Sequence, residues 1–202
     1  MRVKTNKGEF QNFEELVSSM NSIPRKQSTL LIGIDGCGGS GKSTFANEFK
    51  EKCSNVTVVH MDDFYLPSSQ LMKADPKQKP IGPDFDWKRI LNQVLEPISQ
   101  NQEGYYQSYD WEADELTGWH TVPVGGTVII EGVYSIRNEL ANKYDITIWV
   151  DCPRETRLSR GLERDGEEAR DIWENNWMIS EDIYVEEQKP FARADFIVNG
   201  TK

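Results

Sequence analysis

Cysteine, histidine and long apolar segments are all scarce in this chain of 202 residues. The three cysteines contain no C-x-x-C pair, and their odd number is typical of a reducing compartment. No other candidate metal ligands cluster around the two histidines, His60 and His120, so we interpret both as structural. No segment reaches the roughly 18 apolar residues of a membrane span, and the first residues contain no apolar signal segment. We therefore expect a soluble cytoplasmic protein with no membrane partner.

Basic side chains are outnumbered: 23 Lys and Arg face 33 Asp and Glu, for a net charge of −10. This balance argues against nucleic acid as a partner, so any anion must be held by local geometry and a few placed cations. Helix-like and strand-like segments alternate, which predicts one α/β domain over residues 1–202. Residues 1–28 supply an N-terminal helix, expected from about Asn12 to Met20 with Asn12 as its cap, and a lead-in.

A glycine-rich segment at residues 36–43 fits the pattern G-x-x-x-x-G-K-[ST]. It follows an apolar run at 29–35 that predicts a buried strand and precedes a predicted helix at 44–52. In such a loop backbone N–H groups surround an anion, the lysine reaches the β- and γ-phosphates, and the hydroxyl binds Mg²⁺. The sequence therefore predicts a nucleoside triphosphate site. Its candidate residues are Gly36, Cys37, Gly38, Gly39, Ser40, Gly41, Lys42, Ser43 and Thr44.

Cys37 in this loop offers a chemical check of the site. It precedes the N-terminus of the predicted helix, where a thiol pKa can be lowered. We expect bound nucleotide to protect Cys37 from alkylation.

Two further predicted strands end in carboxylates. The apolar run at 56–61 leads into Asp62 and Asp63, and the run at 127–131 ends in Glu131. Open α/β sheets bind ligands at the carboxyl ends of their strands. One of the adjacent aspartates can accept a proton from a substrate hydroxyl and orient it for in-line attack, and Glu131 can hold Mg²⁺ together with the loop serine, Ser43.

The middle of the chain predicts two substrate-side features. Segment 66–86 is rich in proline and longer than a routine connection, which is typical of lids and binding loops, and a helix is expected at 87–99. Strand-like runs at 105–109 and 119–122 flank an acidic turn and predict a hairpin within 104–124. Its aromatic side chains can stack on a planar ring or pack within the hairpin itself.

The tetrapeptide Asn142-Lys143-Tyr144-Asp145 matches the N-K-x-D motif with which GTPases read guanine. That motif should follow a strand, but here it follows a predicted helical run at 136–141 and precedes a predicted strand at 146–151. We interpret the match as chance and do not expect a GTPase switch.

A charged region at 154–187 carries a row of arginines. Arg157, Arg160 and Arg164 are spaced three and four apart, so they share one helix face. A solvated helix with surface ion pairs is the alternative, but beside a phosphate loop guanidinium groups can neutralise the transferring phosphoryl. We therefore predict a lid, followed by a helix that ends near residue 187 and a last strand at 195–198.

These motifs together resemble the uridine kinase family, which is related to phosphoribulokinase and pantothenate kinase. The similarity extends from about Leu30 to Gly200. Besides the phosphate loop, it is carried by Asp62-Asp63-Phe64-Tyr65, Phe85-Asp86, Tyr109-Asp110-Trp111, Ile130-Glu131-Gly132 and Thr156-Arg157-Leu158-Ser159-Arg160. The resemblance implies a P-loop NTPase three-layer sandwich with a five-stranded parallel sheet of nucleoside-monophosphate-kinase type, an inserted β-hairpin and a helical arginine lid.

The resemblance also implies ATP as phosphoryl donor, Mg²⁺ as cofactor and the 5′-hydroxyl of a pyrimidine nucleoside as acceptor. Family members often form dimers or tetramers, so a homo-oligomer is compatible with it. The implied catalytic residues are Asp62 as base, Lys42, Arg157, Arg160 and Arg164. The implied substrate-binding residues are Asp62, Tyr65, Asp86 and Tyr109.

The chain differs from the family at two positions that bear on the acceptor. The histidine that reads the pyrimidine is replaced within Trp111-Glu112-Ala113-Asp114, and the usual Arg-Arg pair of the lid is Arg160-Gly161. A kinase of another alcohol (pantothenate-, glycerate- or sugar-phosphate-like) stays an alternative, as does a non-catalytic ATP-binding regulatory protein. Binding alone would require neither Asp62 nor Glu131.

Overall fold

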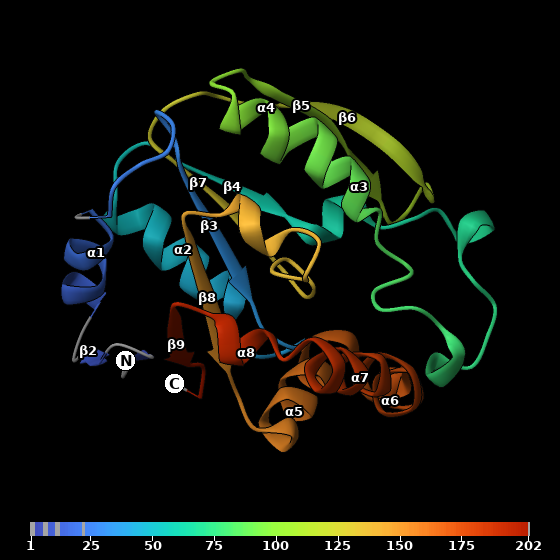
Figure 1. The fold of residues 1–202 in the computed structure, drawn as a ribbon. Coiled ribbons are helices and arrows are strands. Elements are labelled where there is room, and N and C mark those ends of the chain that lie inside the picture. The colour runs from blue at the N-terminus through green and yellow to red at the C-terminus, as the bar shows by residue number, and fades with distance from the viewer. Residues whose placement is uncertain (1–2, 6–7, 11–12, 22, 202) are drawn as a thin grey trace.

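Five parallel strands form the centre of the main sheet. The computed structural model describes residues 3–5, 8–10, 13–21 and 23–201, and Asn12, the expected helix cap, lies outside them. The sheet order is β2-β1-β9-β8-β3-β7-β4 (Figure 1). The parallel strands are β9 (Phe196–Asn199), β8 (Ile146–Asp151), β3 (Leu30–Asp35), β7 (Thr127–Glu131) and β4 (Val56–His60). The predicted five-stranded parallel sheet is thereby confirmed.

Two short strands that the sequence did not predict extend this sheet. β1 (Val3–Thr5) pairs antiparallel with β9, and β2 (Gly8–Phe10) pairs antiparallel with β1. Each has three residues, too few for an alternating apolar pattern to be recognised. They add to the edge of the sheet remote from β4.

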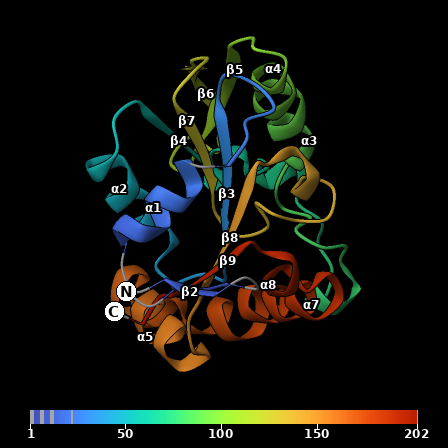
Figure 2. The same cartoon turned by 60° about the vertical axis from the view of Figure 1, so that its left-hand side comes forward.

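Helices cover both faces of the sheet, which gives the predicted three layers. Figure 2 shows α1 (Phe13–Asn21) and α2 (Lys42–Lys52) on one side of the strands, and the helix α3 (Trp87–Ile90) to α4 (Glu96–Ser99) on the other. A π-helical turn at 91–95 joins α3 to α4 without a break, so the helix expected at 87–99 is one continuous element. Because both faces are covered, β3 is buried along its whole length.

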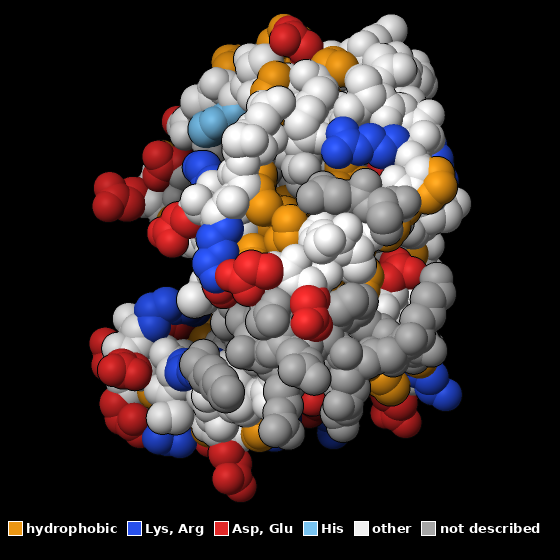
Figure 3. Space-filling view, turned by 90° about the vertical axis from the view of Figure 1, so that its left-hand side faces the viewer, with side chains coloured by type: hydrophobic (Ala, Val, Ile, Leu, Met, Phe, Trp, Pro, Cys, Tyr) orange, Lys and Arg blue, Asp and Glu red, His pale blue; other side chains and the backbone are white. Residues whose placement is uncertain are grey.

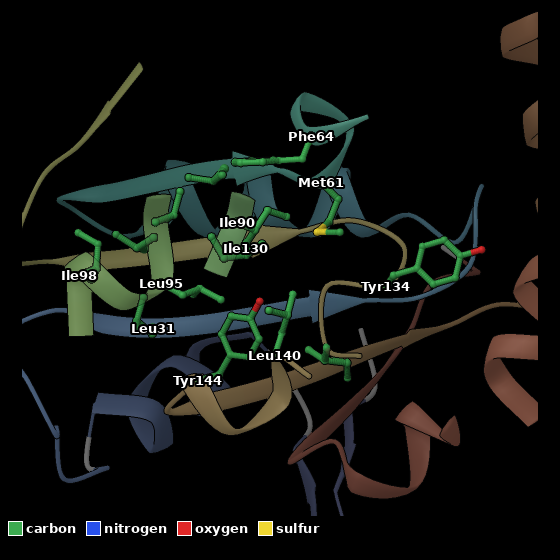
Figure 4. Packing of buried hydrophobic residues seen from close by; sticks show 14 of the residues in the cluster. Leu31, Met61, Phe64, Ile90, Leu95, Ile98, Ile130, Tyr134, Leu140 and Tyr144 are labelled. Atoms are coloured by element: carbon green, nitrogen blue, oxygen red, sulfur yellow. The ribbon is translucent and has the colours of Figure 1, made fainter. Parts of the chain in front are cut away.

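Each face of the sheet has its own apolar core. On the α1–α2 side Phe13 packs edge-on against Phe45 and Phe49, at 5.8 and 5.3 Å between ring centroids. The other side is filled mainly by Ile, Leu, Val and Tyr side chains, among them Leu31 and Ile90 (Figure 4). The two cores fix the strand ends on which the phosphate loop and the carboxylates sit.

The predicted hairpin is present as a separate two-stranded sheet. β5 (Gly104–Asp110) and β6 (Glu115–Val122) are antiparallel, and both are longer than the strands expected from the sequence. Tyr106 anchors the hairpin to the domain, because its ring stacks on Phe64 with centroids 4.9 Å apart.

The C-terminal helices lie across the carboxyl ends of the strands (Figure 1). They are α5 (Arg154–Asp165), α6 (Arg170–Ile172), α7 (Met178–Gln188) and α8 (Pro190–Arg193), with a π-helical turn at 173–177 between α6 and α7. This layer closes the end of the sheet at which the phosphate loop lies.

One predicted element is wrong. The helical run expected at 136–141 is a series of turns that ends in a 3-10 turn at Ala141–Lys143. The backbone N–H of Ile136 donates to Asp35 and the Ser135 hydroxyl donates to the carbonyl of Ile34, so these groups are bound to the end of β3. These contacts with the end of β3 therefore override the local preference of the segment for a helix.

Charged side chains of both signs are mixed on the surface. On the face shown in Figure 3, acidic and basic side chains are interspersed rather than gathered in separate patches. None of the helices within the described ranges is long and apolar enough to cross a membrane.

Candidate active site

The glycine-rich segment forms a tight loop between β3 and α2. Gly39 and Gly41 adopt left-handed conformations, with φ of 73° and 95°, which favour glycine. Lys42 is 8% exposed and its Nζ donates to the carbonyl of Cys37 at 3.1 Å, so the lysine folds back over the loop. This geometry is typical of a phosphate-binding loop.

A buried carboxylate just before the loop ties three segments together. Asp35 accepts hydrogen bonds from the backbone N–H groups of Gly36 (2.6 Å), Tyr134 (3.2 Å) and Ile136 (2.9 Å) and from the Tyr184 hydroxyl (2.7 Å). Burial raises the pKa of Asp35 to about 6, although these donors and Lys42 favour the carboxylate. The phosphate loop, the loop after β7 and α7 thus share one anchor.

Replacing Asp35 with Asn is expected to lower the free energy of unfolding by about 3 kcal/mol. The amide NH₂ of Asn would face N–H and O–H groups that donate hydrogen bonds to the carboxylate, and it cannot accept these bonds. Asp145→Asn is the matched control. Asp145 lies at the opposite end of the strands, just before β8, and among the described residues it accepts from the N–H of Leu31 (2.9 Å) and the Gln27 amide (2.8 Å). Denaturant unfolding should show a clearly smaller loss for Asp145→Asn, and equal losses would contradict the role of Asp35 as the shared anchor.

Helices α5 and α7 pack directly onto the phosphate loop. A Cβ on Gly39 would lie 2.5 Å from the carbonyl oxygen of Arg157, so only glycine permits this approach. From α7, Glu181 accepts a hydrogen bond from the N–H of Gly38 at 2.8 Å and pairs with Arg157 at 2.9 Å. The Arg157–Glu181 pair is buried, with 7% and 6% of the two side chains exposed. Arg157 therefore joins α5 to α7 at the loop.

The strand-end carboxylate Glu131 lies beside the phosphate loop, as its position in the sequence predicts. Its Oε1 accepts from the Ser43 hydroxyl at 3.1 Å and lies 2.6 Å from His60 Nδ1. Burial alone would raise the pKa of Glu131, but His60 and Lys42 lower it overall, so the group stays ionised. Its Oε2 is buried and has no hydrogen-bond partner among the residues that the structure describes. A buried, ionised oxygen without a partner fits a cation ligand.

His60 is a site residue that sequence reasoning missed, since we interpreted it as structural. Bonding to Glu131 raises the pKa of His60. The available signal was its place at the end of β4, two residues before Asp62. His120 matches its structural interpretation, because it stacks on Tyr106 at 5.1 Å and contacts Ser108.

The adjacent aspartates point to different surroundings. Asp62 lines the cavity described below, where desolvation by the surrounding walls raises its pKa while Lys42 opposes the shift. Asp63 instead accepts a hydrogen bond from the Tyr106 hydroxyl at 2.9 Å, which ties it to the hairpin. The geometry thus separates a cavity-facing carboxylate from a structural one.

A cavity of about 800 Å³ lies between the strand ends and the C-terminal helices. Its lining includes most of the phosphate loop, the strand-end carboxylates and an aromatic wall. The aromatic residues of the lining are Phe45, Tyr65, Phe85, Trp111, Tyr134, Trp173 and Trp177. The glycine-rich loop, the strand-end carboxylates and an aromatic wall therefore line one pocket.

The three predicted lid arginines occupy different places. Arg160 lines the cavity and donates to the carbonyls of Gly200 (2.7 Å) and Gly39 (3.3 Å). Arg164 also lines the cavity, is 67% exposed and pairs with Asp165 at 2.6 Å. Arg157 does not line the cavity. Arg164 is thus an exposed side chain at the cavity, whereas Arg160 is bonded to two backbone carbonyls and Arg157 is buried.

The Arg160-Gly161 sequence has a steric explanation. A Cβ on Gly161 would lie 2.5 Å from the ring of Trp173, so a larger residue does not fit there. Trp173 is 2% exposed, and its ring N–H donates to Asp165 at 2.9 Å. The indole therefore occupies the space beside Gly161.

Some of the predicted substrate residues line the cavity and others do not. Tyr65 lines the cavity together with Trp111, at 4.7 Å between their rings. Asp86 instead accepts from the N–H of Arg89 at 3.2 Å and caps α3, while its neighbour Asp84 faces the cavity. The motif Phe85-Asp86 thus locates the segment, but the carboxylate that reaches the cavity is two residues earlier.

Tyr109 is placed behind the cavity rather than in its lining. Its hydroxyl donates to Asp114 at 2.7 Å and its ring contacts Tyr65 and Trp111. Trp111, which is 60% exposed, is the hairpin residue that reaches the cavity. The sequence alone could not show which of these aromatic rings faces inward, because the acidic turn breaks the strand alternation.

Two minor expectations are settled by burial and position. Cys37 is 6% exposed, and burial raises its thiol pKa, so the expected lowering is wrong; α2 begins only at Lys42. In the N-K-x-D match, Tyr144 donates to the carbonyl of Ser135 at 2.8 Å and Lys143 pairs with Glu96. The tetrapeptide precedes β8, at the end of the strands opposite the phosphate loop, as expected for a chance match.

Comparisons with known proteins agree with this architecture. Residues 31–199 match the sequence profile of the phosphoribulokinase / uridine kinase family. A uridine kinase from Ureaplasma parvum is 28% identical over 190 residues, which cover 86% of this chain and 90% of that protein. A uridine kinase from Clostridium novyi is 32% identical over 143 residues, or 67% of this chain and 68% of that protein.

A solved structure described as a possible uridine kinase from Bacillus stearothermophilus is also similar. It has a TM-score of 0.72 at 25% identity and covers 92% of this chain and 96% of its own. The shared fold and the relatives support a kinase. This chain belongs to the phosphoribulokinase / uridine kinase family.

Proposed function

We propose that this protein transfers a phosphoryl group from ATP to a hydroxyl of a small molecule, and that the acceptor is the 5′-hydroxyl of a pyrimidine nucleoside. The observation that carries the proposal is the common cavity. Lys42 from the start of α2, Asp62 from the turn after β4 and Glu131 from the end of β7 all line it. Binding a nucleotide alone would require only the first of these.

In this proposal the phosphate loop and Lys42 hold the β- and γ-phosphates, and Asp62 accepts or orients the proton of the attacking hydroxyl. Arg164 and Arg160 stand at the helical side of the cavity, where positive charge offsets the charge of the transferring group. The covering helices limit access of water, which would otherwise compete as acceptor.

Ser43 and Glu131 are the residues that would hold Mg²⁺. The unpartnered Oε2 of Glu131 and the adjacent Ser43 hydroxyl supply oxygen ligands of the kind that this ion prefers. Among the described residues no three His, Cys, Asp or Glu side chains form a metal-binding group, but Mg²⁺ with a nucleotide needs only one or two protein ligands. Bound there, the ion would neutralise charge on the phosphates.

The nucleoside acceptor is supported by the aromatic wall. Tyr65 packs against Trp111 at 4.7 Å between the rings, and Trp111, which is 60% exposed, offers a ring face on which a planar base can stack. The family membership and the uridine kinase relatives point to the same class of acceptor.

An ATP-consumption screen with Mg²⁺ tests this function. Uridine and cytidine are expected to stimulate ADP formation and to yield the 5′-monophosphate. Turnover of pantothenate, glycerate or a sugar phosphate, with none of a nucleoside, would keep the kinase and replace the acceptor. Tight ATP binding without a phosphorylated product from any alcohol would contradict the proposed function.

A further inference from the structure

Tyr134, three residues after Glu131, adopts a backbone conformation that bulky residues rarely occupy. Its φ is 69°, in the left-handed region. The strain is held by Asp35, which accepts the N–H of Tyr134 at 3.2 Å and that of Ile136 at 2.9 Å. Strained residues that the surrounding structure holds in place are concentrated at functional sites. This conformation aims the side chain past the end of the sheet.

The Tyr134 ring is held on several sides. Its centroid lies 4.9 Å from that of Tyr184 and 5.6 Å from that of Phe85. Gly82 allows the closest approach, because a Cβ there would lie 3.0 Å from the Tyr134 ring. Figure 4 shows the hydroxyl pointing away from the other labelled side chains of the core. The ring is therefore fixed by its neighbours, and Tyr134 is one of the residues that line the cavity.

No hydrogen bond joins the Tyr134 hydroxyl to another residue in the part of the chain that the structure describes. The residue as a whole is 5% exposed, but its hydroxyl oxygen is accessible to solvent. Two comparable tyrosines are satisfied: Tyr144 donates to Ser135 at 2.8 Å and Tyr184 donates to Asp35 at 2.7 Å. Burial raises the pKa of Tyr134 well above its usual value, so the phenol keeps its proton and can donate.

We propose that Tyr134 is a specificity-determining residue that donates a hydrogen bond to a neutral oxygen or nitrogen atom of the phosphoryl acceptor. This inference rests on the proposed function, phosphoryl transfer to a small alcohol. The acceptor side is favoured over the phosphate side because Gly82 and Phe85, which contact the ring, belong to the long loop that also carries Asp84 into the cavity. The phosphates have their own donors in the loop amides and Lys42.

The test compares Tyr134→Phe with Tyr144→Phe in steady-state assays with uridine, or with the alcohol of highest turnover where uridine is inactive. Tyr134→Phe keeps the ring and its packing, so it should raise the KM for the acceptor about tenfold, as expected for one lost hydrogen bond, and leave the KM for ATP unchanged. Tyr144→Phe removes a buried hydroxyl outside the cavity lining, so it should lower thermal stability without changing the acceptor KM.

The outcomes separate this inference from the function on which it rests. An unchanged acceptor KM in an active Tyr134→Phe variant overturns the inference alone. A raised KM for ATP with an unchanged acceptor KM also overturns it, because the phenol would then serve the phosphates. A wild-type protein that phosphorylates no alcohol overturns the proposed function and the inference together.

Discussion

Replacing Asp62 with Asn is expected to reduce kcat by about 10²–10⁴-fold, the range that one positioned acid–base group contributes. Asn is nearly isosteric, so the fold should persist, but it cannot accept the proton of the attacking hydroxyl. Asp62 suits this role because it lines the cavity near Lys42 and Glu131, whose charges act on its pKa in opposite directions. The measurement is single-turnover phosphoryl transfer at saturating ATP and acceptor.

The neighbouring aspartate is the matched control for this variant. Asp63 accepts from the Tyr106 hydroxyl at 2.9 Å, so Asp63→Asn should weaken the anchoring of the hairpin and leave kcat within about tenfold of wild type. Near-full turnover of Asp62→Asn together with loss of turnover in Asp63→Asn would reverse the assignment of the two carboxylates.

The pH profile provides a further check on Asp62. Burial raises its pKa, and the group must be ionised to accept a proton. The rate should therefore rise with pH through the raised pKa of Asp62. This limb of the profile should disappear in Asp62→Asn and persist in Asp63→Asn.

Replacing Lys42 with Met is expected to reduce kcat/KM for ATP by at least about 10²-fold. Electrostatic stabilisation by one preorganised group typically contributes this much, and Met retains the length and apolar stem of the side chain. Lys42 is 8% exposed and lies at the start of α2, where its Nζ contacts the loop carbonyl of Cys37. The loss should be seen both in turnover and in calorimetric binding of ADP with Mg²⁺.

Lys52, in the last turn of the same helix, provides the control. It pairs with Glu48 at 2.9 Å on the surface, where ion pairs contribute little, so Lys52→Met should leave ADP binding and turnover near wild type. Unchanged ADP affinity in Lys42→Met, with an intact fold by circular dichroism, would remove Lys42 from the phosphate site.

The phosphate-binding loop could be predicted from the local sequence. The glycine pattern with its lysine and serine, an apolar strand before it and a helix after it depend on contacts between near neighbours in the chain. Strand-end carboxylates were readable for the same reason, because parallel strands of one sheet place their carboxyl ends at one edge. These signals pointed to Glu131 and to one of Asp62 and Asp63, the choice of Asp62 came from the family resemblance, and both Asp62 and Glu131 line the cavity.

What only the tertiary structure decided is where side chains distant in sequence meet. Glu181 binds the N–H of Gly38 and pairs with Arg157, so Arg157 does not line the cavity with the other two predicted arginines. No spacing rule in the sequence connects α7 with the phosphate loop.

The same holds for Tyr134. Tyr134 precedes the run predicted as a helix at 136–141, and no sequence pattern indicated its left-handed conformation, in which Asp35, about a hundred residues earlier, accepts its backbone N–H. Local sequence encodes backbone preference and periodicity, whereas a buried carboxylate or an unpartnered hydroxyl acquires its role from neighbours that only the folded sheet brings together.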